Sequence, residues 1–251
     1  GVTQTGQDVT AAVAKNMAAR RSCVCLMAAC AGAEVLPVDV GIAADMTGTG
    51  ILDRKIAWGT RDFLKESAMT RKEAVKALEV GIEAAGILHE KGCDLAGTGE
   101  MGIGNTTTSS AVASVLLDQP VETMTGRGAG LSSDGLTRKI NAIKKAIALN
   151  EPDPSDPIDV LAKVGGLDIA GMAGVYLGGA ALQIPVLIDG FISGVAALVA
   201  AGICPQAKDY MIASHVSKEP AAHLVLEKLG KEAVLHADMC LGEGTGAIAL
   251  C

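Results

Sequence analysis

The stretch DLAGTGEMGIGNTTTSS, residues 94–110, gives the clearest indication of the fold. An apolar run leads into glycines at positions 97, 99, 102 and 104, and amide and hydroxyl side chains then suit the start of a helix. This order of strand, glycine loop and helix is typical of α/β proteins, whose ligands bind beyond the carboxyl ends of parallel strands. Glycine loops of this kind attract anions, yet Glu100 lies in the middle of this one.

Strand-like and helix-like segments alternate on both sides of this stretch. The apolar segments expected to be strands are 33–42, 93–99, 121–126, 184–190, 209–214 and 233–238. The segments with helical patterns are 71–92, 106–118, 135–150, 156–166, 168–182 and 219–230. This alternation predicts a three-layer, Rossmann-like α/β fold, with a mostly parallel sheet flanked by helices. Acids follow several of these strands and are expected to face one cleft, namely Asp39, Glu100, Asp189 and Glu243.

The amino-acid composition and charge of the chain limit the kinds of molecule that it is expected to bind. Hydrophobic residues make up 49% of the 251 residues and charged residues 20%, so the chain is not disordered. The net charge of -7 is spread without a basic cluster, which argues against binding to nucleic acid or to an anionic membrane surface. Two uncharged runs, 169–188 and 190–207, are long enough to span a bilayer, but Gln183 and Pro185 and a strand-like run divide them. We therefore expect no membrane insertion.

The seven cysteines show neither a CxxC motif nor a Cys/His spacing suited to zinc. We expect reduced, buried thiols in a cytoplasmic protein, and no metal site. The four histidines have no carboxylate or cysteine at a telling spacing, and the GxSxG motif of a serine hydrolase is absent.

The segment GTGEMG, residues 97–102, matches the GxGxxG pattern of dinucleotide-binding proteins. In that family an acid about 20 residues further on follows a second strand, whereas Asp118 here ends a helical pattern. Glu100 would also lie beside the pyrophosphate. A dehydrogenase is therefore disfavoured, and Gly102, Gly104, Asn105 and Thr106 are better explained as contacts with another ligand than as a simple helix cap.

Two further segments contain candidate site residues. In GRGAGLSSDGLTRKI, residues 126–140, Lys139 is either part of a solvated helix face or an inward cation for a phosphate. In LGEGTGAIAL, residues 241–250, glycines flank Glu243. An apolar setting near a phosphate disfavours a charged carboxylate, which favours proton uptake at neutral pH. Glu100 is either a second such group or an acceptor for the N–H groups of its own loop.

Five segments together resemble the nicotinate-nucleotide:dimethylbenzimidazole phosphoribosyltransferase family. They occur in the family's order and are GTGEMGIGNTTTSSA (97–111), GRGAGLSSDGLTRKI (126–140), KVGGLDIAGMAGVYLGGA (163–180), PVLIDGFISGVAAL (185–198) and LGEGTGAIAL (241–250). The resemblance extends over essentially the whole chain. It implies transfer of phosphoribose from nicotinate mononucleotide to a benzimidazole nitrogen without a cofactor, with release of nicotinate and inversion at C1′.

The resemblance also implies an organisation for the chain. Residues 1–30 are expected to form part of a small helical domain built from terminal segments, and residues 31–251 the α/β catalytic domain. Members of the family carry further sequence at both ends, so the small domain is expected to be truncated at its N-terminus here. The family forms homodimers.

By position, Glu243 matches the family's catalytic base and Glu100 a second active-site glutamate. The residues expected to bind substrate are Met101, Gly102, Ile103, Gly104, Asn105, Thr106, Gly128, Lys139, Asp189, Gly190, Ser217, Gly242 and Gly244. The acceptor base stays open between 5,6-dimethylbenzimidazole, related azoles and adenine, with Thr5, Gln7 and Trp58 as candidates for selecting it. The alternative function is a nucleotide-binding protein of the same fold that has no turnover.

Overall fold

The computed structural model describes residues 2–251, so that only Gly1 of the predicted segment 1–30 lies outside the described residues. The helices are α1 (Asp8–Ala18), α2 (Cys23–Ala31), α3 (Arg71–Glu90), α4 (Asn105–Leu116), α5 (Val121–Met124), α6 (Ser133–Asn150), α7 (Pro157–Val164), α8 (Leu167–Leu182), α9 (Gly190–Ile203), α10 (Ala222–Leu229) and α11 (Thr245–Leu250), with a 3₁₀ helix at Pro205–Tyr210. The strands are β1 (Val38–Asp39), β2 (Leu52–Asp53), β3 (Ala96–Gly97), β4 (Val186–Ile188) and β5 (Met211–Ala213).

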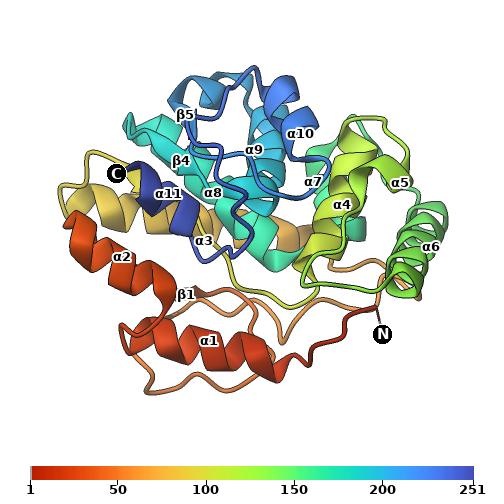
Figure 1. Cartoon of the computed structure of the whole chain (residues 1–251), viewed down its shortest axis with the longest axis horizontal. Coiled ribbons are helices and arrows are strands. Elements are labelled where there is room, and N and C mark those ends of the chain that lie inside the picture. Colours follow the sequence, from red (N-terminus) through yellow and green to blue (C-terminus); the bar gives the residue numbers. More distant parts are fainter. Residues whose placement is uncertain (1) are drawn as a thin grey trace.

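The central sheet is parallel, as predicted. Its three strands lie in the order β3, β4, β5, with Ala96 opposite Val186 and Val186 opposite Met211. A single parallel bridge between His215 and Leu235 continues the sheet. The helices α8, α9 and α11 pack on β4, and α1 and α2 lie below the main body in the view of Figure 1. The carboxyl ends of β3 and β4 therefore lie side by side, as a ligand site at this edge requires.

Three predicted strands differ from the structure. Segment 121–126 contains the short helix α5, because Pro120 precedes it and the buried Val121 and Met124 are spaced as on one helix face. Segment 233–238 contributes only the bridge at Leu235. Segment 33–42 contains β1, which pairs with β2 in a separate two-stranded sheet.

The placement of Asp39 at a common cleft is therefore wrong. Its carboxylate accepts hydrogen bonds from the backbone N–H groups of Gly41 and Ile42 and forms an ion pair with Lys55 at 2.7 Å. Asp39 is 1% exposed and all of these partners lie in its own part of the chain. This acid organises the loop after β1 instead of contributing to the site at the end of β3.

The main core is built from small and aliphatic side chains, as the shortage of aromatic residues requires. Its tightest contact joins α3 to α8. A Cβ atom on Gly81 would lie 1.9 Å from the carbonyl oxygen of Gly171, and one on Gly174 would lie 2.0 Å from that of Leu78. The two helices therefore touch through their backbones.

A second, smaller core lies under α1. It contains Ala11 and Ala14 of α1 together with Met46, with Ile42 and Ile51 packed against it. The helix α2 packs separately against α11, near the other end of the chain. The division into segments 1–30 and 31–251 stays a prediction.

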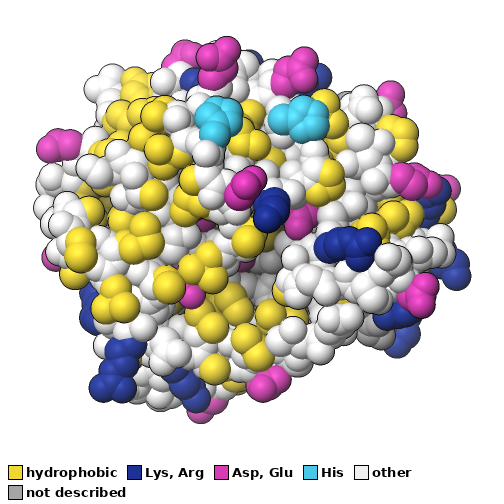
Figure 2. All heavy atoms as spheres, in the orientation of Figure 1, with side chains coloured by type: hydrophobic (Ala, Val, Ile, Leu, Met, Phe, Trp, Pro, Cys, Tyr) yellow, Lys and Arg dark blue, Asp and Glu magenta, His cyan; other side chains and the backbone are white. Residues whose placement is uncertain are grey.

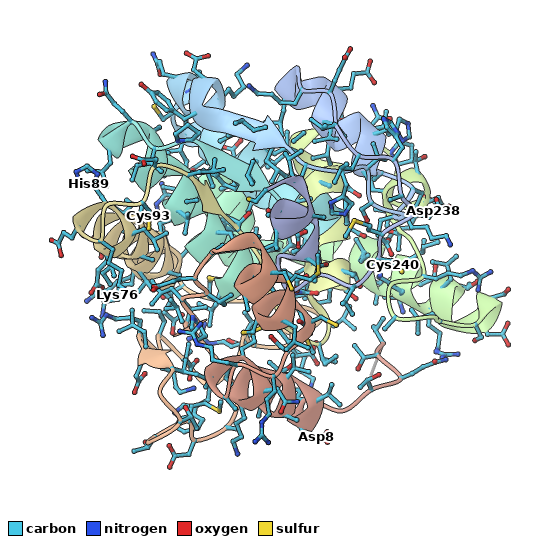
Figure 3. All side chains as sticks on the ribbon, turned by 60° about the vertical axis from the view of Figure 1, so that its left-hand side comes forward. Asp8, Lys76, His89, Cys93, Asp238 and Cys240 are labelled. Atoms are coloured by element: carbon cyan, nitrogen blue, oxygen red, sulfur yellow. The ribbon has the colours of Figure 1, made fainter. Side chains whose placement is uncertain are left out.

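The cysteines are free, but the prediction that they are buried is wrong for most of them. Cys25 is buried in α2, Cys93 and Cys204 are partly exposed, and the exposed ones are Cys23, Cys30, Cys240 and Cys251. Figure 3 shows that Cys93, just after α3, and Cys240, in the loop before α11, lie on different parts of the fold. The sequence pattern misled because α2 is apolar on nearly all sides, including the side that faces outward.

Across residues 2–251, none of the helices combines the length and the apolar character needed to cross a bilayer.

Candidate functional site

A cavity of about 740 Å³ lies between the first two helices and the main body. Thr10, Ala14 and Met17 of α1 and Val24 of α2 line one side. The loop after β3, the start of α8 and the loop before α11 line the other. Figure 2 shows that the face toward the viewer is hollowed near its centre, with hydrophobic side chains gathered around the hollow.

Glycines bring the two glutamate loops into contact at the end of the sheet. The N–H of Glu243 donates to the carbonyl oxygen of Glu100 at 3.1 Å. A Cβ atom on Gly99 would lie 2.5 Å from the nitrogen of Gly244, and one on Gly242, whose φ is 83°, would lie 2.6 Å from Oε1 of Glu100. These glycines therefore let the loops touch, so that the two carboxyl groups share one cavity wall.

Glu243 is held in a conformation that few side chains adopt. Its φ is 62°, in the left-handed region, and Oε2 of its carboxylate accepts a hydrogen bond from the N–H of Val24 at 3.1 Å. Val24 lies in the first turn of α2, where the helix N-terminus favours a negative charge. The contact fixes this carboxylate at the cavity wall, beside the first turn of α2.

Asp189 positions the loop of Glu243 through hydrogen bonds to its backbone. Its carboxylate accepts hydrogen bonds from the N–H groups of Gly244 at 2.9 Å and Gly246 at 2.7 Å, at the start of α11. His215 lies beside it, with Nδ1 3.9 Å from Oδ1. Burial raises the pKa of Asp189 and lowers that of His215. The structure thus places Asp189 behind the cavity wall, where it fixes the backbone that carries Glu243.

Glu100 belongs to a carboxyl–amide–carboxyl group that includes an acid absent from the predicted set. The side-chain amide of Asn105 donates both to Oε2 of Glu100 and to Oδ2 of Asp168, the latter at 2.8 Å. Burial raises the pKa of Glu100 to about 8, with a further contribution from the charge of Asp168. Burial also raises the pKa of Asp168. Near neutral pH Glu100 therefore keeps a proton that an exposed glutamate would release.

Lys139 points inward, which decides between its two expected positions. It is 1% exposed, and its ammonium group donates to Oγ1 of Thr106 and to the carbonyl oxygen of Gly126, both at 3.0 Å. Burial lowers the pKa of Lys139, while the charge of Glu219 opposes that shift. A buried ammonium group behind the first turn of α4 is a suitable counter-charge for an anion bound there.

The remaining predicted residues form a connected group next to Lys139. The N–H of Gly128 donates to Oε1 of Glu219 at 3.0 Å, and the N–H of Glu219 donates to Oγ of Ser217 at 3.3 Å. A Cβ atom on Gly190, whose φ is 65°, would lie 3.4 Å from that of Ser217. Oε2 of Glu219 is buried without a hydrogen-bond partner among the described residues.

The predicted site residues therefore fall into two neighbouring groups. Those that line the cavity are Glu100, Met101, Gly102, Ile103, Gly104, Asn105, Glu243 and Gly244. Those that are not among its lining residues are Thr106, Gly128, Lys139, Asp189, Gly190, Ser217 and Gly242. Thr106 connects the groups, since it follows Asn105 directly and contacts Lys139. The roles of these residues in binding and catalysis stay predictions.

Sequence reasoning missed three contributors to the site. They are Asp168, the backbone N–H of Val24, and Thr10, whose hydroxyl accepts a hydrogen bond from the N–H of Ile103 at 3.0 Å. The available signal for Asp168 was the glycine pair that precedes it, because a Cβ atom on Gly166 would lie 2.5 Å from Oδ1 of this acid. Within residues 2–251, His, Cys, Asp and Glu do not gather in a group of three that could hold a metal ion.

Comparison with known proteins agrees with this geometry. The family model described as "Phosphoribosyltransferase" matches residues 1–251. A protein of Acetivibrio thermocellus named nicotinate-nucleotide–dimethylbenzimidazole phosphoribosyltransferase is 51% identical over 247 residues, covering 98% of this chain and 70% of that protein. A protein of the same name from Geobacter metallireducens is 48% identical over 248 residues, covering 98% of this chain and 70% of that protein.

A solved structure agrees as well. The crystal structure described as CobT from Thermus thermophilus matches with a TM-score of 0.96 at 37% identity, covering 100% of this chain and 75% of that one. The predicted α/β fold and the family resemblance are therefore confirmed. The chain belongs to the phosphoribosyltransferase family whose relatives are named nicotinate-nucleotide–dimethylbenzimidazole phosphoribosyltransferase.

Proposed function

We propose that this chain moves the 5-phosphoribosyl group of nicotinate mononucleotide to a benzimidazole-type base. The products are nicotinate and α-ribazole 5′-phosphate, with inversion at C1′. The observation that supports this most directly is the pairing of Glu100 and Glu243 on one wall of a 740 Å³ cavity. The carboxylate of Glu243 accepts a hydrogen bond from the N–H of Val24, whereas burial raises the pKa of Glu100 to about 8.

The two glutamates have different roles in the proposed reaction. The nitrogen lone pair of the azole attacks C1′ while the bond from C1′ to the pyridinium nitrogen breaks, and its electrons neutralise the leaving nicotinate ring. The azole N–H proton passes to the carboxylate of Glu243, which acts as the general base. Glu100, whose proton passes to the solvent when the cationic donor binds, faces the positive charge that develops at C1′ and stabilises it as a carboxylate.

The arrangement of the walls suggests where each substrate binds. Glu243 points to Val24, so the base that it deprotonates lies against the apolar side chains of α1 and α2, including Ala14 and Met17. The phosphate lies toward Thr106 and Lys139. Gln7 lines the cavity and is a candidate for selecting the base, whereas Trp58 is 63% exposed and does not line it.

The oligomeric state and the cellular location do not follow from the site geometry and are proposed on other grounds. We propose a homodimer, as the family resemblance implies, and a cytoplasmic location, as free cysteines favour. Sedimentation of the purified chain tests the first, and fractionation of the source cell tests the second.

A direct assay tests the reaction and the base together. The chain is mixed with nicotinate mononucleotide and 5,6-dimethylbenzimidazole, and nicotinate and α-ribazole phosphate are followed by chromatography. Glu243→Gln is expected to lower kcat by about a hundredfold or more, the lower end of what a general base supplies. The matched control is Glu79→Gln, which makes the same change at an exposed position of α3 and is expected to leave the rate unaltered.

The outcomes separate the two candidate functions. Nicotinate release that depends on the azole supports the transferase. Tight binding of the nucleotide without release of nicotinate, with several azoles and adenine tried as acceptors, would instead support a nucleotide-binding protein. If Glu243→Gln releases nicotinate as fast as the unaltered chain, Glu243 is not the base.

A further inference from the structure

The side chains around the cavity are unbalanced in charge. Glu34, Glu100, Asp168 and Glu243 line it, and of these Glu34 forms an ion pair with Lys91 at 3.3 Å. Among residues 2–251, no lysine, arginine or histidine side chain lines the cavity. Lys139, the nearest buried cation described above, lies on the far side of Thr106 and is directed at the carbonyl oxygen of Gly126. The part of the cavity beside Asp168 is therefore suited to a positively charged group.

Of Glu100, Asp168 and Glu243, Asp168 is the acid that the proposed reaction leaves without a role. It lies in the first turn of α8, where Oδ1 accepts a hydrogen bond from the N–H of Ile169 at 2.9 Å. Its other oxygen, Oδ2, accepts a hydrogen bond from the side-chain amide of Asn105. The same oxygen lies 3.1 Å from the position that a Cβ atom on Gly102 would occupy. The carboxyl group is therefore fixed at the cavity wall beside the loop of Glu100.

Asn105 joins the two carboxyl groups without neutralising either. An amide nitrogen carries two hydrogens, so one is directed at each acid. The ionisable groups that act on Glu100 come from three further elements: Asp168 on α8, Asp189 at the end of β4 and Glu243 before α11. All of them are acids, so a carboxylate that ionises beside Asn105 gains no cationic partner from these groups.

We propose that Asp168, acting with Glu100 across Asn105, selects a nucleotide donor whose ring carries a positive charge over one of the same shape with a neutral ring. This inference rests on the proposed function. The pyridinium ring of nicotinate mononucleotide supplies the missing positive charge, and its approach stabilises the ionised pair. After transfer the leaving nicotinate has a neutral ring nitrogen, so this attraction to the leaving ring ends with the reaction.

Burial of Glu100 and Asp168 adds a second measurable property to the preference in affinity, namely the release of protons on binding. The pKa of Glu100 is raised to about 8, so this side chain carries a proton near pH 7 when the site is free. When a cation binds beside the pair, a carboxyl group ionises and its proton leaves to the solvent. A neutral ring gives no such release. Binding of the cationic donor is therefore accompanied by proton release, whereas binding of a neutral analogue is not.

Calorimetry with two forms of the same nucleotide tests the inference. Nicotinate mononucleotide and its 1,4-dihydro form differ by a hydride, which removes the ring charge but keeps the ribose, the phosphate and the ring substituent. Titrations at pH 7.5 in two buffers of different ionisation enthalpy give both affinity and proton release. We expect the unaltered chain to bind the cationic form about tenfold or more tightly, the factor that one unit in log Kd represents.

Substitutions of Asp168 test whether this residue selects the cationic donor or only supports the fold. Asp168→Asn is expected to weaken binding of the cationic form alone, which lowers the affinity ratio and the proton release together. Asp168→Glu, which keeps the charge, is expected to restore much of the ratio. The matched control is Asp118→Asn, an exposed acid beyond the other end of α4 from Asn105, which is expected to leave the ratio unchanged.

Several results would overturn the inference. Equal affinity of the unaltered chain for the two forms would do so by itself, even if Asp168→Asn failed to fold. An equal loss of affinity for both forms in Asp168→Asn would show that Asp168 only supports the loop of Glu100. Nicotinate release is measured separately, so a chain that prefers the cation but transfers no phosphoribose would refute the proposed function and leave the selection standing.

Discussion

At the scale of single residues, Glu100 shows how burial changes the chemistry of an acid. The same side chain in a solvated loop would be ionised at neutral pH, and its neighbours here are further acids and one amide. The glycines around it resemble those of a phosphate loop, but they serve close contact between two loops. A glutamate in such a setting is therefore better suited to respond to a positive charge than to hold a phosphate.

The raised pKa of Glu100 predicts how stability depends on pH. The carboxyl of the unfolded chain loses its proton near pH 4.5, whereas that of the folded chain keeps it to about pH 8. The folded state binds more protons between these values, so the free energy of unfolding falls as pH rises through this window, by up to about 1.4 kcal/mol per pH unit for one proton. Glu100→Gln removes this contribution.

Urea unfolding of both proteins between pH 5 and pH 8 measures the effect. The stability of Glu100→Gln relative to the unaltered chain is expected to increase steadily with pH. A difference between the two proteins that stays constant across this range would show that Glu100 ionises in the folded chain as it does in the unfolded one.

At the scale of elements, helices were easier to predict than strands. The helix α3 begins with a capping box between Thr70 and Glu73, and its buried positions recur at helical spacing, so its predicted range of 71–92 is close to Arg71–Glu90. The strands have only two or three residues each, too few to show a period of two. Segment 121–126 was mistaken for a strand because a short apolar run fits either element.

Contacts between distant elements could be predicted only in part. The ends of parallel strands correctly indicated that Glu100 and Glu243 meet. The hydrogen bond between Asn105 and Asp168 joins residues 63 positions apart and depends on how α8 enters the core. The N–H of Val24 is a backbone group, so its side chain gives no sign of the bond to Glu243. Such partners follow from packing angles, which a sequence pattern does not contain.

The contact between α3 and α8 provides a test on one helix. Gly81 faces the backbone of α8, whereas Gly86, also in α3, has no heavy atom within 4 Å of an added Cβ. Gly81→Ala is expected to destabilise the chain by about 1–3 kcal/mol or more through overpacking. Gly86→Ala is expected to stabilise it by about 0.4–1 kcal/mol, because alanine loses less backbone freedom in a helix.

Thermal and urea unfolding of the two alanine variants give the comparison. Because both changes add one methyl group to the same helix, helix propensity affects them alike, and the difference reports the contact with α8. Similar stability of the two variants would contradict the backbone contact at Gly81.

At the scale of the whole molecule, the exposure of the thiols predicts a reactivity pattern. Cys25 and Cys30 lie on one helix, but Cys25 is buried with its thiol directed at the carbonyl oxygen of Met17, whereas Cys30 is exposed. Alkylation of the native chain is expected to modify Cys23, Cys30, Cys240 and Cys251 rapidly and Cys25 only after local opening. Peptide mass spectrometry with time measures each site, with the urea-unfolded chain as the reference. Equal rates for Cys25 and Cys30 in the native chain would contradict the packing of α2.

The bond between Val24 and Glu243 ties the beginning of the chain to its end. Because Val24 lies in the first turn of α2, any displacement of this helix from the loop before α11 breaks the bond. In the proposed reaction, the position of the general base therefore depends on a contact between an early helix and the last loop of the chain.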